Sequence, residues 1–261
     1  MKENKYENLD LEIIYDRAMQ GNDAEANYQL AHRYKEGIGV NRDREKAAEF
    51  YLKAAELGHA DAQNIVGCSY FGGSVFKKDE ELGIYWLRKS AEQGHVFSQF
   101  ILSSRFISDN NADIERKEEG FKWLTKAAEQ DNVGAQRLLG DFYLIGTDFC
   151  EKDYNKAVCW LTKAAEQGDA KAQYELGCCY YSGDGVKPDM EKAVPWLKKA
   201  AEQDYDPAIF KLGLCYKYGE GVDENPQIAF KYFKQSAEQG NPYAQSYIRY
   251  YMMTSPSTEN H

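Results

Sequence analysis

One six-residue phrase recurs along the chain at a nearly constant interval. Its clearest copy is the segment 163–168, with the sequence Lys-Ala-Ala-Glu-Gln-Gly. The second alanines of successive copies are 36, 37, 37, 36 and 36 residues apart. A period of this length is typical of stacked helical arrays, in which each unit buries its apolar face against its neighbours. The second alanines are Ala55, Ala91, Ala128, Ala165, Ala201 and Ala237.

The first half of each repeat has the pattern of an amphipathic helix, named helix A below. In the segment 170–180, Ala172, Leu176 and Tyr180 recur every four residues and therefore lie on one helix face. A small residue stands three positions before an aromatic one in every copy, which lets helix A approach a neighbouring helix closely. These small residues are Ala31, Gly67, Ser103, Gly140, Gly177 and Gly213.

The second half of each repeat predicts another helix, named helix B. A Gly-x-Gly turn at 183–185 ends helix A, because glycine accepts positive φ, and Asp189 can cap the next helix. One large aromatic recurs on helix B, and we expect the six rings in the core: Phe50, Trp86, Trp123, Trp160, Trp196 and Tyr232. Seven residues earlier, five copies carry a capping residue and one carries arginine: Asp43, Asp79, Arg116, Asp153, Asp189 and Asn225.

Three single residues carry separate expectations. Pro195 lies inside helix B of the fifth repeat, where it removes a backbone donor and predicts a local kink. His59 and His95 follow glycine at equivalent turns, and we interpret both as solvated turn residues.

Composition narrows the classes of partner. The chain has 261 residues and a formal net charge of −10, so it lacks the basic face that nucleic acid binding requires. No stretch is long and apolar enough for a signal peptide or a membrane span. We therefore expect a cytoplasmic protein with no membrane partner, or a secreted or periplasmic one if a leader was removed.

The sequence offers no pattern typical of catalysis or of metal binding. Six cysteines occur without a C-x-x-C motif or matched pairs within each repeat, which favours free thiols. We interpret the carboxylates as helix caps or as residues on solvated helix faces. No isolated pair in an apolar setting suggests general acid–base chemistry. The Gly-x-Gly turns lack the preceding strand of a dinucleotide site. We therefore expect no catalytic residues, no metal and no cofactor.

The consensus A-x-A-Q-x-x-L-G-x-x-Y, G-x-G-V, D-x-x-K-A-x-x-W-L-x-K-A-A-E-Q-G resembles the Sel1-like repeat, a branch of the tetratricopeptide superfamily. This resemblance implies an all-α fold, a right-handed α-solenoid of stacked antiparallel helix pairs whose A helices line the concave surface. It further implies a non-enzymatic adaptor for protein complexes, often in bacteria and in signalling or host interaction.

The repeats place the expected boundaries. A single solenoid should cover 1–253 and be followed by a disordered tail at 254–261. Within it we expect an N-terminal capping helix at 9–21 and a C-terminal capping helix at 242–253. The six repeats between them are expected at 23–58, 60–94, 96–131, 133–168, 170–204 and 206–240.

Residues that point into the groove without being needed for the fold are the candidate binding residues. Helix geometry and the resemblance place them at four positions of helix A: between its two alanines, after its glutamine, after its small residue, and one or two residues after its aromatic. The set is rich in aromatics, which suit the centres of interfaces. It comprises Tyr28, Phe71, Phe97, Phe100, Arg137, Leu144, Tyr174, Tyr181, Phe210, Leu214 and Tyr243.

Three functional hypotheses follow. The first is an adaptor that grips a partner's peptide or helix in the concave groove. The second is a small-molecule hydrolase, for which the sequence offers only scattered Ser, Cys and His. The third is a structural protein that self-associates into homo-oligomers. An alternative for the aromatic set itself is that Phe97, Phe100 and Phe210 simply pack between neighbouring A helices.

Overall fold

The computed structural model describes residues 10–73 and 75–254, and these form helices joined by short loops. The chain divides into two compact units, residues 1–130 and 131–261. The helices of the first unit are α1 Leu11–Met19, α2 Ala24–Glu36, α3 Arg44–Glu56, α4 Ala60–Gly72, α5 Glu80–Glu92, α6 Val96–Ser108 and α7 Ile114–Glu129. Those of the second are α8 Val133–Ile145, α9 Tyr154–Glu166, α10 Ala170–Ser182, α11 Met190–Ala201, α12 Asp206–Tyr218, α13 Pro226–Glu238 and α14 Pro242–Thr254.

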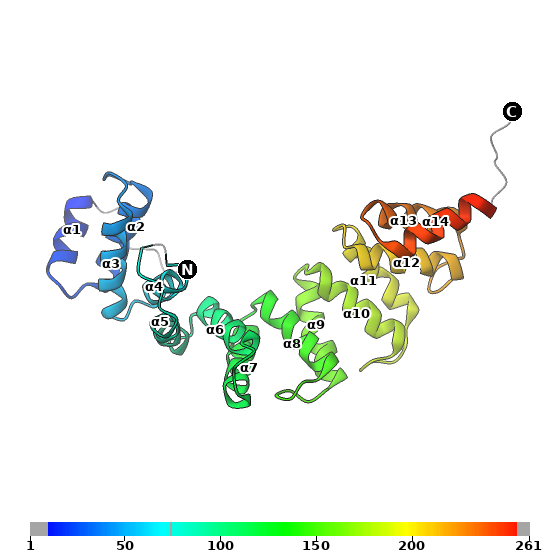
Figure 1. The fold of residues 1–261 in the computed structure, drawn as a ribbon, viewed down its shortest axis with the longest axis horizontal. Helices are drawn as coiled ribbons and strands as arrows, with labels where there is room; N and C mark the ends of the chain where they lie inside the picture. The colour runs from blue at the N-terminus through cyan, green and yellow to red at the C-terminus, as the bar shows by residue number, and fades with distance from the viewer. Residues whose placement is uncertain (1–9, 74, 255–261) are drawn as a thin grey trace. The chain divides into compact units, whose positions relative to one another are not determined.

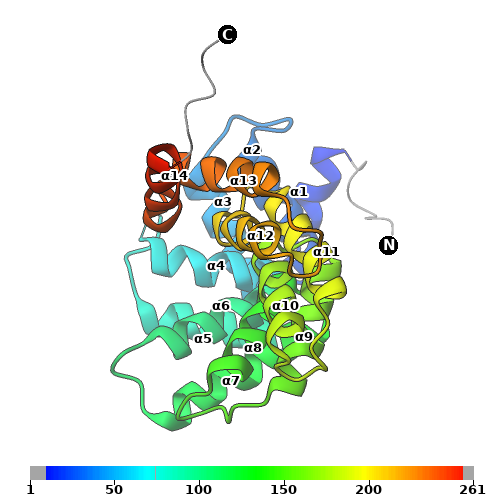
Figure 2. The ribbon, with the colours of Figure 1, turned by 90° about the vertical axis from the view of Figure 1, so that its right-hand side faces the viewer.

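The helices alternate as the sequence predicts, and consecutive ones pack against each other within each unit (Figures 1 and 2). The even-numbered helices are the A helices, and the odd-numbered ones are the B helices. The expected all-α fold of stacked helix pairs is therefore confirmed. Helix α14 ends at Thr254, one residue beyond the expected capping helix, and the rest of the expected tail, 255–261, lies outside the described residues.

Glycine at the small-residue position brings the A helices α4, α8, α10 and α12 close to the following B helix. A Cβ atom on Gly177 would lie only 3.0 Å from the side chain of Leu197 on α11. On Gly140 it would lie 2.6 Å from Leu161 on α9. Such distances are too short for any larger side chain, so the predicted role of the small residue in close helix packing is confirmed.

The B helices begin where the capping residues predict, with one exception. The carboxylates of Asp43 and Asp189 accept hydrogen bonds from backbone amides in the first turns of α3 and α11. In the third repeat, where Arg116 stands at the capping position, the cap lies three residues earlier in the chain. Helix α7 starts at Ile114 because Asp113 caps it, accepting a 2.9 Å hydrogen bond from the amide of Arg116.

The recurring glutamines join the repeats through a series of side-chain hydrogen bonds. Gln63, buried on α4, donates to the carbonyl of Ala55 at 3.0 Å and accepts from Gln93 at 2.8 Å. We call the series the glutamine ladder. Its bonds run from Gln93 to Gln63, Gln130 to Gln99, Gln167 to Gln136 and Gln203 to Gln173. The first repeat lacks the pair because Leu57 stands at the end of its B helix. The sixth lacks it because Ile209 stands on its A helix.

The aromatic residues of the B helices lie at the edge of the core. Phe50, Trp86 and Trp123 are buried, whereas Trp160 and Trp196 are half-buried. The ammonium groups of Lys163 and Lys199 cover the exposed sides of those two rings, at 4.4 and 4.1 Å from the ring centres. Phe50, Trp86 and Trp123 thus lie in the core as the sequence predicts, whereas Trp160, Trp196 and Tyr232 are only half-buried at its edge.

Candidate functional site

The predicted groove residues of the first unit lie in different surroundings. Tyr28 on α2 stacks on the ring of His59, with ring centres 4.2 Å apart. Phe71 on α4 packs against Gly83 of α5, and the Arg105 guanidinium lies 4.4 Å from its ring centre. Phe100 on α6 is half-buried, but Phe97 on the same helix is 64% exposed. Of these four residues, Phe97 offers the most free apolar surface.

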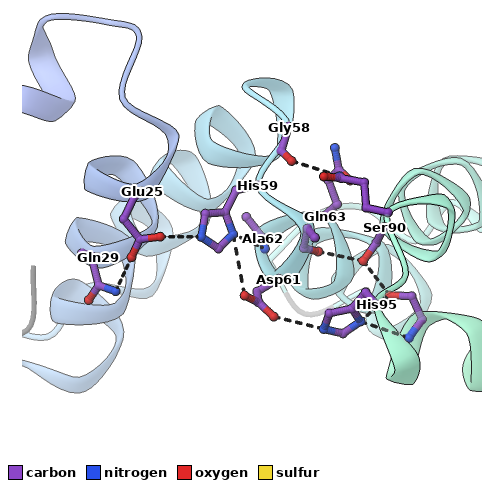
Figure 3. A network of polar contacts seen from close by, with 12 residues as sticks. Glu25, Gln29, Gly58, His59, Asp61, Ala62, Gln63, Ser90 and His95 are labelled. Atoms are coloured by element: carbon purple, nitrogen blue, oxygen red, sulfur yellow. Dashed lines mark hydrogen bonds and ion pairs between the residues drawn. The ribbon is translucent and has the colours of Figure 1, made fainter. Parts of the chain in front are cut away.

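A chain of polar contacts runs from Glu25 through His59 and Asp61 to His95 and joins three consecutive A helices (Figure 3). The Nε2 of His59 lies 3.0 Å from a carboxylate oxygen of Glu25, and its Nδ1 accepts from the amide of Ala62 at 3.3 Å. His95 repeats the arrangement one repeat later, with Nε2 3.1 Å from Asp61 Oδ1. Since Nδ1 of each ring accepts a backbone hydrogen bond, the proton of the neutral ring is on Nε2 and is donated to the carboxylate.

The interpretation of His59 and His95 as solvated turn residues is therefore wrong. Both are the N-caps of A helices, and both join consecutive A helices through a carboxylate. A signal was present in the sequence, because Asn132 and Asp169 occupy the equivalent position in later repeats. Histidine replaces the usual Asn or Asp cap and reaches further, since its second ring nitrogen remains available for the neighbouring helix.

The predicted groove residues of the second unit pack mainly among themselves and their neighbours. Phe210 on α12 contacts Phe233 and Tyr243, with ring centres 5.5 and 6.2 Å apart. The ring of Tyr174 lies 5.5 Å from that of Tyr205. Leu144 and Leu214 are half-buried beside the core. Packing thus accounts for Phe210, whereas Tyr243 on α14 leaves 74% of its surface exposed.

Tyr181, at the end of α10, is held by two polar neighbours. Its hydroxyl donates a 2.7 Å hydrogen bond to Glu220, and the ammonium of Lys211 lies 3.3 Å from its ring centre. The hydrogen bond to Glu220, followed by burial, raises the pKa of Tyr181 to about 12. The tyrosine is therefore a neutral donor at physiological pH and links the loop after α12 to α10.

Four charged side chains form a cluster between α8 and α10, which we call the charged cluster: Arg137, Asp141, Lys171 and Glu175. One oxygen of Asp141 accepts from Arg137 at 3.1 Å and from Lys171 at 2.8 Å. Lys171 also lies 3.4 Å from Glu175. The Asp141 and Glu175 side chains are only 14% and 17% exposed, so the cluster is largely shielded from water.

Glu175 is the unusual member of the charged cluster. Burial, followed by the neighbouring Asp141, raises its pKa to about 8, against the opposing effect of Lys171. The second oxygens of Asp141 and Glu175 are both buried and accept no hydrogen bond from any described residue. A proton held by Glu175 gives this pair the donor that it lacks. The expectation that all carboxylates are caps or solvated is wrong for these two residues.

Comparison with known proteins identifies the fold family. The Sel1 repeat family model matches residues 24–59, 60–95, 112–132, 133–169, 170–205 and 206–241. The chain belongs to the Sel1 repeat family. The third match is short and omits α6, the helix in which Ser103 replaces the glycine of most Sel1 repeats in the chain.

Two solved Sel1 repeat structures resemble the whole chain. One is c5321, a protective antigen present in uropathogenic Escherichia coli strains that displays an SLR fold. It is 31% identical over 97% of this chain, with a TM-score of 0.82. The other is a Sel1 repeat protein from Oxalobacter formigenes, 28% identical over 94% of this chain and 70% of its own, with a TM-score of 0.74. The chain spans 54% of the length of c5321. No curated protein gives a significant match.

The contacts between A helices follow the Sel1 repeat period. Glu25 and His59, Asp61 and His95, and Asn64 and Ser98 are each 34 residues apart, and each pair is in contact. Asp141 and Glu175 have the same separation. Side chains that lie 34 residues apart, about two fewer than the repeat period of 36, are therefore next to each other on neighbouring A helices. This signal would have located the charged cluster from the sequence.

The cysteines of this Sel1 repeat chain are all free thiols. Burial raises the pKa of Cys179 to about 12 and that of Cys215 to about 11, so neither forms a thiolate near neutral pH. In the described residues, no group of three or more His, Cys, Asp or Glu is arranged to hold a metal ion. None of the described helices has the length and apolar character needed to cross a bilayer.

Proposed function

We propose that this Sel1 repeat chain is a non-enzymatic scaffold that holds another protein against the exposed face of its A helices. Sel1 repeat folds commonly serve as scaffolds for protein interaction. The observation that carries the proposal is the exposure of Phe97 and Tyr243. Both occupy the same position of their repeats, the second residue of an A helix, and both leave most of an aromatic ring in water.

Exposed aromatic rings at a repeated position favour binding of a protein. An aromatic side chain buries a large apolar area on binding and loses little conformational entropy, which is why such residues dominate interface energetics. The partner is therefore a protein segment that presents apolar side chains to Phe97 or to Tyr243.

The experiment is capture of partners from the native cell with purified chain as bait. We expect Phe97→Ser and Tyr243→Ser each to reduce capture, because each removes an exposed ring without opening the core. Tyr85→Ser is the matched control, since Tyr85 is 49% exposed but lies on a B helix. Equal capture by all three variants and the parent, with unchanged circular dichroism, would exclude the A-helix face as the binding surface.

The experiment must also distinguish binding of a different protein from self-association of the chain. Light scattering of the pure chain at several concentrations measures it without any partner. If the chain forms oligomers that Phe97→Ser or Tyr243→Ser disrupts, the exposed rings serve contacts between copies. The proposal of a different protein as partner is then wrong.

A further inference from the structure

The first unit contains a pocket of about 310 Å³ between α3 and α4. Its walls are mainly apolar and include Ala48 and Tyr51 of α3, Ile65 and Val66 of α4, and Phe76 of the following loop. The volume falls within the range of roughly 300–1,000 Å³ that is usual for small-molecule sites. The pocket lies apart from Phe97, so it is independent of the proposed partner surface.

The other repeats show why there is space at this place. Ala48 on α3 is the smallest residue at its position, where the remaining repeats carry Ile84, Phe121, Val158, Val194 and Phe230. Across the pocket, Ser69 occupies the position that is filled by Tyr251 at the last of these helix contacts. There the rings of Phe230 and Tyr251 pack with centres 4.7 Å apart. Ala48 and Ser69 thus open a space that the rings of Phe230 and Tyr251 fill at the last of these contacts.

Three cationic side chains line the same pocket: Lys35, Arg42 and Arg44. No Asp or Glu is among the lining residues, although the chain carries a net charge of −10. The second repeat has Phe71, Lys78 and Glu80 at the equivalent positions, so this concentration of positive charge belongs to the first repeat.

Glu36 compensates part of this positive charge, since Lys35, and to a smaller extent Arg42, lower its pKa. Lys35 forms an ion pair with Glu36 at 3.1 Å, and both side chains are substantially exposed. Arg42 uses its Nε to donate to the carbonyl of Lys35 at 2.9 Å, which anchors its guanidinium beside the pocket. Arg44 forms no ion pair with any residue of 10–73 or 75–254. Guanidinium groups bind carboxylates through charge-assisted hydrogen bonds.

We propose that this pocket binds a small carboxylate with an apolar body, of the class of medium-chain fatty acids. The apolar chain lies between α3 and α4 in the space left by Ala48 and Ser69. The carboxylate pairs with Arg42 and Arg44. Burial of the apolar chain and pairing of the carboxylate then both contribute to the binding affinity. A neutral alcohol or a cationic amine of the same length lacks the charge pairing.

The test is isothermal titration calorimetry of the whole chain with octanoate, compared with 1-octanol and octylammonium. We expect saturable binding of one octanoate per chain, with both comparison compounds about tenfold weaker or worse, a difference of about 1.4 kcal/mol. Absence of saturable octanoate binding would overturn the proposal, as would equal binding of octylammonium.

Substitutions locate the binding. Ala48→Phe fills the space with the residue that Phe121 and Phe230 provide in other repeats, and we expect it to weaken octanoate binding about tenfold or more. Ala48→Val, as in Val158 and Val194, is a milder version if the phenylalanine disturbs folding. Octanoate binding that is unchanged in a folded variant of either kind contradicts the assignment of the site.

A charge reversal tests the cationic residues. Arg44→Glu introduces the residue that the second repeat carries as Glu80, and we expect it to weaken octanoate about tenfold with no effect on octanol. Lys152→Glu is the matched control, because Lys152 occupies the position of Arg42 in the fourth repeat, away from the pocket. If both reversals weaken octanoate equally, only the net charge matters and the site is wrong.

Discussion

The side-chain amide of Gln93 donates a 2.8 Å hydrogen bond to the buried side-chain oxygen of Gln63. Gln63 in turn donates to the carbonyl of Ala55, the last alanine of the preceding B helix. One buried amide therefore connects the ends of two B helices in successive repeats. This contact explains why the sequence repeats a glutamine both inside helix A and at the end of helix B.

Removing one partner of this bond should destabilise the first unit. We expect Gln63→Ala to cost roughly 1–3 kcal/mol in free energy of unfolding, because the carbonyl of Ala55 loses its donor and the amide of Gln93 keeps only the carbonyl of Gly58 as an acceptor. The urea midpoint of unfolding measures the effect. The double variant Gln63→Ile with Gln93→Ala should lose less free energy of unfolding than Gln63→Ile and Gln93→Ala lose together as single variants. The reason is that the double variant leaves no side-chain amide without its partner. Strict additivity would contradict the ladder.

The cap at His59 leads to a second prediction. Replacing His59 by Ala should lower the stability of the first unit by about 1 kcal/mol, because the amide of Ala62 loses its acceptor. His59→Asn should retain most of the stability, since Asn132 performs the same capping at the start of α8. Thermal unfolding followed by circular dichroism compares the two variants. Equal melting temperatures for Ala and Asn would show that the cap contributes nothing.

The raised pKa of Glu175 predicts a pH dependence of stability. In the unfolded chain a glutamate has its ordinary pKa of 4.5, whereas in the fold the pKa of Glu175 is about 8. Between these values the folded state binds more protons than the unfolded state, so this residue's contribution to stability falls as the pH rises. We expect the melting temperature to fall from pH 5 to pH 8 in the parent.

Glu175→Gln is the isosteric control for this titration. The amide stays neutral at every pH and can donate to Asp141, so the fall in melting temperature between pH 5 and pH 8 should become smaller. The variant should be at least as stable as the parent at pH 8. If parent and variant show the same pH profile, Glu175 is not the titrating group.

Helix α11 provides a stabilising substitution. It runs without interruption from Met190 to Ala201 although Pro195, which is exposed, lies in its sixth position. Pro195→Lys copies Lys122 and Lys231 at the equivalent positions and restores a helical backbone donor. We expect a gain of about 1–3 kcal/mol, the penalty for proline inside a helix reduced by its smaller entropy in the unfolded chain. A lower melting temperature would contradict this expectation. The kink at Pro195 stays a prediction.

Local patterns predicted the fold well, because the small residues, caps and aromatic rings act within one repeat. Gly177 and Asp189 perform the roles that their spacing indicates. The start of α7 was missed because Asp113 lies three residues ahead of the equivalent caps, and the period concealed it. Phe97 and Phe210 occupy nearby positions of their repeats, yet one is exposed and the other packed. Their neighbours determine the difference, and the repeat pattern does not record it.

The charged cluster was missed for a different reason. Asp141 and Glu175 belong to different repeats, and each alone resembles a solvated carboxylate on a helix. Only the offset of 34 residues between neighbouring A helices shows that they meet. The raised pKa then depends on how much water the surrounding side chains exclude, which no spacing in the sequence specifies.

The distribution of the glutamine ladder has a consequence for the way the chain opens. The glutamine pairs lie within the inner repeats, whereas Leu57 in the first repeat and Ile209 in the last leave the outermost repeats without this bond. In a linear array each repeat is stabilised chiefly by its neighbours, so unequal contacts produce unequal local stability. Amide hydrogen exchange should therefore be fastest in the helix pairs α2–α3 and α12–α13 and slowest between them. Repeats of similar sequence therefore differ in local stability, which is lowest at the two ends of the array.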